Sequence, residues 1–276
     1  MPTPEQYFAP AAATIVTGGS SGIGNSLIKA IKTVKPNGPI CNLSRTQPAD
    51  FPGRGDRHIP TDLASESELG AAADAVLGWL PELPPGPVVL INNSGLGDYG
   101  ALPSGDRGKQ LRMIDLNARA VADLTLRLLP ALRERGGAVV TVASTAAFQP
   151  TPYLATYGAT KAFALHWALA LDEDLRGTGV RSLAVCPGPT RSNFFKAAGF
   201  ARPPVGEDGA AGGGMSADAV AWRTLRALAR GKTLEVTGLR NKCVAVAGRL
   251  APKVWASRAG GAILRRMRLE RHRARE

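Results

Sequence analysis

The chain of 276 residues, 44% of them hydrophobic, is long enough to bury the core of one large α/β domain or of two small ones. Its net charge of +12 is uneven: residues 240–276 hold nine arginines and two lysines against two glutamates, a net +9, so residues 1–239 carry only +3. The first residues lack the basic segment of a signal peptide, and no stretch reaches the roughly 18 uncharged apolar residues of a membrane span.

Short β-branched or apolar runs alternate along the chain with longer helical patterns, and this order predicts a doubly wound, Rossmann-type parallel sheet of about seven strands flanked by helices. Ligands of such sheets bind beyond the carboxyl ends of the strands. The expected strands are 13–17, 39–44, 57–60, 88–92, 138–144, 180–186 and 233–237. The expected helices are 24–34, 66–80, 113–135, 156–175 and 216–231.

The three cysteines, Cys41, Cys186 and Cys243, are scattered and odd in number, and two of them lie in expected strands. This pattern favours reduced thiols in a cytoplasmic protein over a disulfide framework. The three histidines form no spaced cluster with carboxylates, so no metal is expected.

A glycine-rich turn, TGGSSGIG at 17–24, follows the first expected strand and leads directly into a helix. Gly18 allows a tight turn, Gly22 leaves room for a diphosphate beside the backbone, and Gly24 allows the helix to pack closely on the strand. The N-terminus of the helix would face the anion. The alternative, a glycine-rich turn with no ligand, is less favoured at this place in the chain.

Tyr157 and Lys161 are four residues apart in the stretch YGATKAFAL, so they share one face of the expected helix. One interpretation is an ordinary surface pair. The other is that the Lys161 ammonium lowers the pKa of the Tyr157 phenol, which is about 10 when free.

The turn at 17–24, the motif NNSG at 92–95, Ser144, the Tyr157–Lys161 pair and CPGPT at 186–190 occur together in a fixed order. In these motifs the sequence resembles the short-chain dehydrogenase/reductase family over about residues 13–240. The resemblance implies a single catalytic domain over residues 1–239, followed by the basic extension 240–276. Within that domain the glycine- and proline-rich segment 196–215 is a candidate lid over the site.

The resemblance also implies a catalytic set of Asn117, Ser144, Tyr157 and Lys161. Tyr157 would be the general acid/base, and Lys161 would favour its phenolate and hold the nicotinamide ribose. Ser144 would hydrogen-bond the substrate carbonyl, and the Asn117 side chain would help to hold a water that links the lysine to solvent. Taken alone, Ser144 could equally be a serine at a strand end and Asn117 a polar helix residue.

The cofactor implied by the resemblance is a nicotinamide nucleotide. Its expected contacts are Gly18, Ser20, Ser21, Gly22, Ile23, Gly24, Ser44, Arg45, Asp62, Leu63, Asn93, Ser94, Gly95, Tyr157, Lys161, Pro187, Gly188 and Thr190. Ser94 stands where the family more commonly has alanine, and Asp62 could instead be a helix N-cap. The second expected strand ends in Ser44 and Arg45, without the carboxylate that would repel a 2′-phosphate, so NADP is favoured over NAD.

The sequence therefore predicts an NADP-dependent oxidoreductase that interconverts a ketone or aldehyde and an alcohol. Phe148, Leu154, Phe194 and Phe195 lie next to the catalytic motifs and favour an apolar substrate of lipid, acyl, steroid or retinoid type, although they could instead be core residues. The alternative function is a non-catalytic NADP-binding regulatory protein on the same fold. A nucleic-acid binder is disfavoured, because the basic segment lacks interleaved aromatic residues.

The basic extension predicts an amphipathic helix around Ile263 and Met267, interrupted upstream by Pro252 and by the pair Gly260 and Gly261. It is either a solvated basic end or a peripheral contact with anionic membranes, and an acidic carrier protein is a third partner class. The family resemblance further implies a homo-oligomer, a dimer or a tetramer.

Overall fold

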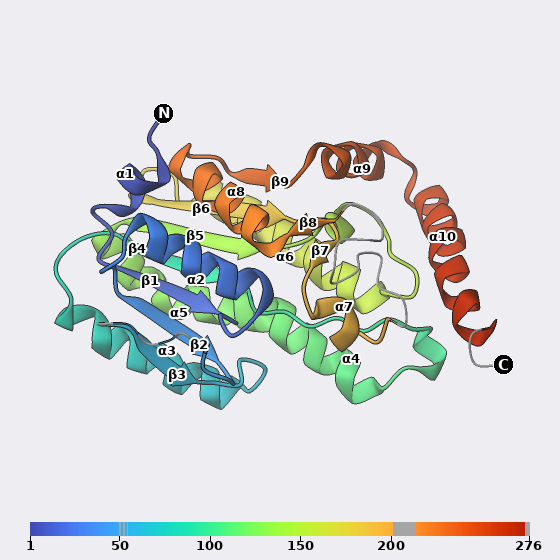
Figure 1. Ribbon diagram of the computed structural model, residues 1–276, viewed down its shortest axis with the longest axis horizontal. Coiled ribbons are helices and arrows are strands. Elements are labelled where there is room, and N and C mark those ends of the chain that lie inside the picture. The colour runs from blue at the N-terminus through green and yellow to red at the C-terminus, as the bar shows by residue number, and fades with distance from the viewer. Residues whose placement is uncertain (50, 52, 54, 201–213, 274–276) are drawn as a thin grey trace.

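The fold is built on one parallel sheet of seven strands, in the order β3-β2-β1-β4-β5-β6-β9 (Figure 1). The computed structural model describes residues 1–49, 51, 53, 55–200 and 214–273. The strands of the sheet are β1 Ala13–Thr17, β2 Ile40–Ser44, β3 Arg57–Pro60, β4 Val88–Asn92, β5 Gly137–Val142, β6 Val180–Cys186 and β9 Leu234–Val236, and a separate pair consists of β7 Thr190–Arg191 and β8 Met215–Ser216. The Rossmann-type parallel sheet expected from the sequence is confirmed.

Helices cover both faces of the sheet (Figure 1). The α-helices are α1 Pro4–Phe8, α2 Gly22–Val34, α3 Glu66–Trp79, α4 Arg107–Ile114, α5 Ala120–Arg135, α6 Ala155–Asp174, α7 Phe194–Ala197, α8 Ala217–Ala229, α9 Leu239–Leu250 and α10 Lys253–Arg273. Successive residues of β1 point to opposite sides, because side chains alternate along a strand. Ile15 therefore packs with Leu69 and Leu124 of α3 and α5, whereas Val16 packs with Leu27 and Leu225 of α2 and α8. Both faces are apolar, which is why the strands are nearly continuous hydrophobic runs.

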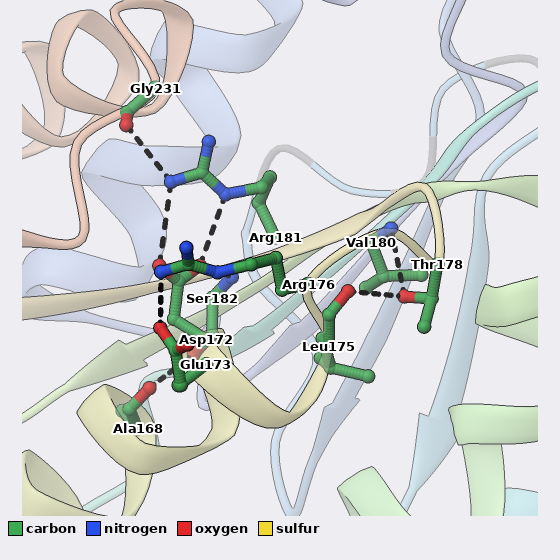
Figure 2. A network of polar contacts seen from close by, with 10 residues as sticks. All are labelled: Ala168, Asp172, Glu173, Leu175, Arg176, Thr178, Val180, Arg181, Ser182 and Gly231. Atoms are coloured by element: carbon green, nitrogen blue, oxygen red, sulfur yellow. Dashed lines mark hydrogen bonds and ion pairs between the residues drawn. The ribbon is translucent and has the colours of Figure 1, made fainter.

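A polar network fixes α6 to the start of β6 (Figure 2). Asp172 Oδ1, near the end of α6, accepts hydrogen bonds from the backbone N–H of Ser182 at 2.8 Å and from Arg181 Nε at 3.1 Å. The Ser182 hydroxyl donates to the carbonyl of Ala168, 2.9 Å away, and Arg181 also donates to the carbonyl of Gly231. The helix that carries Tyr157 and Lys161 is thus held in register with the sheet.

The segment expected as one helix over 113–135 is in fact three elements. Helix α4 begins earlier, at Arg107, because the Asp106 side chain accepts hydrogen bonds from the backbone N–H groups of Gly108 and Lys109 and so caps its N-terminus. A π-helical turn, η3 Asp115–Arg119, then separates α4 from α5. A single π-turn inside a helical stretch has no residue signature of its own, so the sequence pattern did not reveal it.

The extension 240–276 contains α9 and α10, which follow the last strand and lie at one edge of the molecule (Figure 1). They are separated near Pro252 as expected, but the expected break at Gly260 and Gly261 is wrong, because α10 runs straight through the pair. Each glycine costs a helix about 1 kcal/mol relative to alanine. Here the pair lies beside Pro152: a Cβ built at Gly261 would lie 3.5 Å from its ring, an ordinary van der Waals distance.

Two further observations concern the described part of the chain. Of the expected lid 196–215, residues 201–213 lie outside the described residues, and helix α7 occupies 194–197. Within the described ranges, none of the helices has the length and apolar content needed to cross a membrane.

Candidate active site

A cavity of about 820 Å³ lies beyond the carboxyl ends of β1, β4, β5 and β6. One end is lined by the turn after β1 together with Arg45 and Asp62, and the other end by apolar side chains that include Phe194, Phe200 and Leu264. Ser144, Tyr157 and Lys161 line the same cavity: the Tyr157 ring packs against Phe194 of the apolar end, and Lys161 lies beside Gly95 of the loop after β4. Every expected site residue lines this cavity except Gly24 and Asn117. Gly24 packs against Gly18, and Asn117 is hydrogen-bonded to Leu96, so both contact residues of the cavity wall.

The backbone of the turn between β1 and α2 has conformations that require glycine. Gly18 and Gly22 have φ angles of +67° and +54°, a region that favours glycine. A Cβ built at Gly24 would lie 2.1 Å from the carbonyl oxygen of Gly18, so only glycine allows the helix to start this close to the strand. Among the described residues no side chain caps the N-terminus of α2 at Ser21, which leaves its backbone N–H groups available to an anion.

Neighbouring strands hold this turn from two sides. Asn93, just after β4, donates from Nδ2 to the carbonyl oxygens of Thr17 and Gly18, at 3.0 and 3.1 Å. Asn42, in the middle of β2, accepts a hydrogen bond from the backbone N–H of Gly19. Asn42 was not among the expected site residues, because a single asparagine inside a strand carries no local signal of its partner.

Tyr157 lies at the centre of the cavity, beside Ser144 at the end of β5. Burial raises the pKa of Tyr157 to about 12, while a hydrogen bond with Ser144 acts in the opposite direction and the nearby Cys186 thiol adds to the rise. The ring of Phe194 packs against the Tyr157 ring at 5.2 Å between centroids. The phenol therefore keeps its proton over the whole neutral range, and the expected lowering of its pKa by Lys161 is wrong for this structure, because burial outweighs the other contributions and Lys161 is not among the groups that shift it.

Lys161 is a buried ammonium with only 5% of its surface exposed. Its Nζ donates to the carbonyl oxygen of Val142, 2.8 Å away. Burial lowers the pKa of Lys161 to about 8, and the neighbouring Cys186 works against this shift. A Cβ built at Gly95 would lie 3.2 Å from the Lys161 Nζ and 3.4 Å from Oδ1 of Asn117, so glycine at 95 keeps the space beside the ammonium open.

Asn117 lies in the π-turn η3 and is fully buried. Its amide accepts from the backbone N–H of Leu96 at 2.9 Å and donates to the carbonyl of Leu96 at 2.8 Å and to the hydroxyl of Thr160. These bonds fix the loop after β4 to α6. π-turns often occur at functional sites, and this one places the Asn117 side chain directly behind Gly95. The water-holding role implied by the resemblance stays a prediction.

Near the carboxyl ends of β2 and β3, the cavity is lined by two arginines and one aspartate. Arg45 is exposed at the end of β2, and Asp62 forms an ion pair with Arg112 of α4. Burial acts to raise the pKa of Asp62, but the hydrogen bonds from Arg112 and from the Ala64 N–H, with the charges of Arg112 and Arg45, hold it below its usual value. The alternative of Asp62 as a helix N-cap is wrong, because Ser65 caps α3. Arg112 is a cavity residue that the sequence analysis missed.

The loop after β6 is fixed by contacts on both of its sides. The Thr190 hydroxyl donates to the carbonyl of Gly188, and the carbonyl of Pro187 accepts from the backbone N–H of Thr145. A Cβ built at Gly188 would lie 2.2 Å from Oδ1 of Asn241, so α9 of the C-terminal extension packs directly on this loop.

The apolar end of the cavity draws on distant parts of the chain. Leu154, Phe194 and Phe195 line it as expected, but Phe148 instead packs in the core with Leu165 and Ala245. Phe200 and Leu264 also line the cavity, and neither was expected. No local pattern could have found them, because they meet only through the fold.

Comparison with known proteins adds to this geometry. The sequence model of the short chain dehydrogenase family matches residues 12–201. A short chain dehydrogenase of Pseudocercospora fijiensis is 35% identical over 191 residues, 65% of this chain and 60% of the relative. Ketoacyl reductase HetN of Nostoc sp. is 30% identical over 208 residues, 68% of this chain and 70% of the relative. A solved short-chain dehydrogenase from Sphingobium yanoikuyae in complex with NADPH has the same fold, with a TM-score of 0.71 at 23% identity over 86% of this chain and 92% of that one.

The matched stretch spans less than two thirds of the fungal relative's length. It nevertheless includes the motifs that meet around the cavity, from the glycine turn at Gly18 to Thr190. The chain belongs to the short-chain dehydrogenase family.

Proposed function

We propose that the protein is an NADP(H)-dependent oxidoreductase that interconverts a ketone or aldehyde and an alcohol. The observation that carries the proposal is the position of Ser144, Tyr157 and Lys161, between an open nucleotide turn and an apolar end of one cavity. A proton donor at such a junction can act on a carbonyl group that lies beside a bound nucleotide.

The cavity fits a nicotinamide nucleotide. The uncapped start of α2 offers backbone N–H groups to a diphosphate, and Gly22 and Gly95 leave space that a side chain would fill. Exposed Arg45 is suited to a 2′-phosphate, in line with the NADPH found in the Sphingobium relative. When bound, the nicotinamide would supply or accept the hydride. In the described part of the chain, no group of three or more His, Cys, Asp or Glu side chains could hold a metal ion.

The residues of the chain would handle the proton. Tyr157, with its pKa near 12, keeps its phenolic proton at neutral pH and donates it to the carbonyl oxygen as the carbonyl carbon is reduced. Ser144 donates a hydrogen bond to the same oxygen, where negative charge develops. Lys161, fixed by the Val142 carbonyl, places a positive charge beneath the site that stabilises the phenolate left after proton transfer.

An apolar substrate is supported by the lining of the far end of the cavity, where Phe194, Phe195, Phe200 and Leu264 gather. The Nostoc relative is named a ketoacyl reductase, which agrees with an acyl chain in this place. A homo-oligomer and a membrane contact of the C-terminal extension belong to the proposal as well. The membrane contact is supported by the exposure of Trp255, 74%, and Leu250, 79%, on helices that also carry basic residues.

The test is a panel of carbonyl substrates, with NADPH oxidation followed by fluorescence. The panel should include a short water-soluble ketone and acyl or steroid ketones of increasing size. Turnover by the wild type that is lost in Tyr157→Phe supports the oxidoreductase. Tight NADPH binding without turnover of any carbonyl would instead support the regulatory protein.

A further inference from the structure

We propose that the pair of helices α9 and α10 docks on an anionic lipid surface and places the apolar end of the active-site cavity against it, so that a lipid carbonyl substrate enters from the membrane past Leu264. The inference rests on the proposed reduction of an apolar carbonyl compound. It adds the source of the substrate and the element through which it enters.

The inner face of α10 is part of the cavity wall. Leu264 lines the cavity, and its carbonyl oxygen accepts a hydrogen bond from the Tyr99 hydroxyl, 2.8 Å away. One turn earlier, Gly260 and Gly261 lie against the Pro150–Pro152 segment, close before the helix that carries Tyr157. A movement of α10 would therefore change the apolar end of the site.

Polar contacts also connect the described part of α10 to the rest of the protein. Arg265 Nε donates to the Tyr153 hydroxyl at 3.3 Å, and Lys253 Nζ donates to the carbonyls of Phe148 and Gly248. Tyr153 itself has a φ of +64°, a strained conformation for a non-glycine residue.

The outer face of α9 carries an apolar stripe. Leu239, Val246 and Leu250 recur at helical spacing and are 79%, 54% and 79% exposed. Asn241, Ala245 and Gly248 form the opposite, shielded face. The stripe therefore points away from the protein.

The basic residues of α9 lie beside this stripe. At 100° per residue, Arg240 falls on one flank, and Lys242 and Arg249 fall on the other. An apolar stripe between two basic flanks is the pattern of a helix that lies in a membrane interface.

Helix α10 also has exposed apolar side chains. Val254, Trp255 and Ile263 are 62%, 74% and 64% exposed, and Arg258 and Arg265 lie exposed on the same helix. In Figure 1, α9 runs along the top of the molecule and the chain then bends so that α10 descends along its right-hand side. Trp255 precedes Leu264 by nine residues, which is half a turn at 100° per residue, so α10 presents Trp255 outward and Leu264 toward the cavity.

Charge selects an anionic lipid surface over the other occupants. Residues 239–265 contain six basic residues and no acidic residue, so two copies of this surface would repel each other. Nucleic acid would match the charge but leave the apolar stripe without a partner. An anionic bilayer attracts the basic residues and also buries the apolar stripe. Each basic residue near it strengthens binding about fivefold.

The test uses the full chain with vesicles of phosphatidylcholine alone or mixed with phosphatidylserine. We expect co-sedimentation only with the anionic vesicles. The double variant Leu250→Ser, Trp255→Ser should bind them about 10- to 100-fold more weakly, because two large apolar side chains no longer enter the interface. Leu126→Ser, which alters a leucine 58% exposed on α5, is the matched control and should bind as the wild type does.

Activity separates this inference from the proposed function. The double variant should reduce a short water-soluble ketone at the wild-type rate and lose turnover of a long-chain ketone embedded in the vesicles. Equal binding by wild type and double variant, or equal turnover of the embedded ketone, would overturn the docking. Absence of turnover of the soluble ketone by the wild type would overturn the oxidoreductase, whatever the vesicles show.

Discussion

The backbone N–H of Gly19 donates a hydrogen bond to Oδ1 of Asn42, 2.9 Å away, and so connects the turn after β1 to the middle of β2. Asn42 is fully buried and also donates to the Ser44 hydroxyl, one residue before Arg45. A Cβ at position 19 would lie 2.4 Å from the same oxygen. The two ends of the nucleotide side, the glycine turn and the Ser44–Arg45 strand end, are thus set by one asparagine.

Tyr157→Phe removes the proton donor and keeps the shape of the ring. We expect turnover to fall about 10² to 10⁴-fold, the contribution of a general acid. NADPH binding, titrated by fluorescence, should change little, because the nucleotide turn is untouched. Unchanged turnover in the variant would mean that another group donates the proton.

Arg45→Ala should weaken NADPH selectively. A charge-assisted bond to the 2′-phosphate contributes about 1.5–3 kcal/mol, so the dissociation constant should rise roughly 10- to 100-fold. NADH, which has no phosphate there, is the internal control and should bind as before. An equal loss for both nucleotides would assign Arg45 a structural role.

Gly24→Ala should disrupt the nucleotide turn, since the new Cβ would meet the Gly18 carbonyl at 2.1 Å. We expect the free energy of unfolding to fall by about 1–3 kcal/mol, as in other overpacked sites, and NADPH binding to be lost. Gly78→Ala is the matched control: its Cβ would meet no described atom within 4 Å, and α3 should gain about 0.5–1 kcal/mol. Denaturant titration of both variants measures the difference.

Lys161→Met should alter how stability depends on pH. The folded pKa of Lys161 is about 8, below the 10.5 of the unfolded chain, so between these values the unfolded chain binds more protons. The free energy of unfolding of the wild type should therefore rise with pH in this window, relative to the variant, by about 1.4 kcal/mol per unit. Urea titrations at several pH values test this. If the free energy of unfolding of the wild type instead falls relative to the variant as the pH rises, the folded protein stabilises the Lys161 ammonium.

The sequence located the strands well, because a parallel strand buried on both faces is a short apolar run whatever its neighbours are. Val88–Asn92 and Val180–Cys186 begin and end where the sequence predicted them. The helix over 113–135 was misjudged because its start depends on one capping side chain, Asp106, in a polar stretch, and its interruption on a π-turn.

The site was predictable where it consists of motifs and not where it consists of tertiary contacts. Gly18, Ser144 and Tyr157 follow strands or lie on a predicted helix, and the parallel sheet brings such positions to one edge. Phe200 and Leu264 come from elements whose direction no local pattern specifies. The continuous α10 shows the same limit, since its contact with the Pro150–Pro152 segment exists only in the folded chain.

The walls of the cavity extend in the chain from Gly18 to Leu264. During synthesis the glycine turn and the strands around it emerge from the ribosome before α10 does, and a domain generally folds as a unit. A chain that has just completed the nucleotide side therefore still lacks the Leu264 wall of the apolar end, and the cavity can close only after α10 has been synthesised.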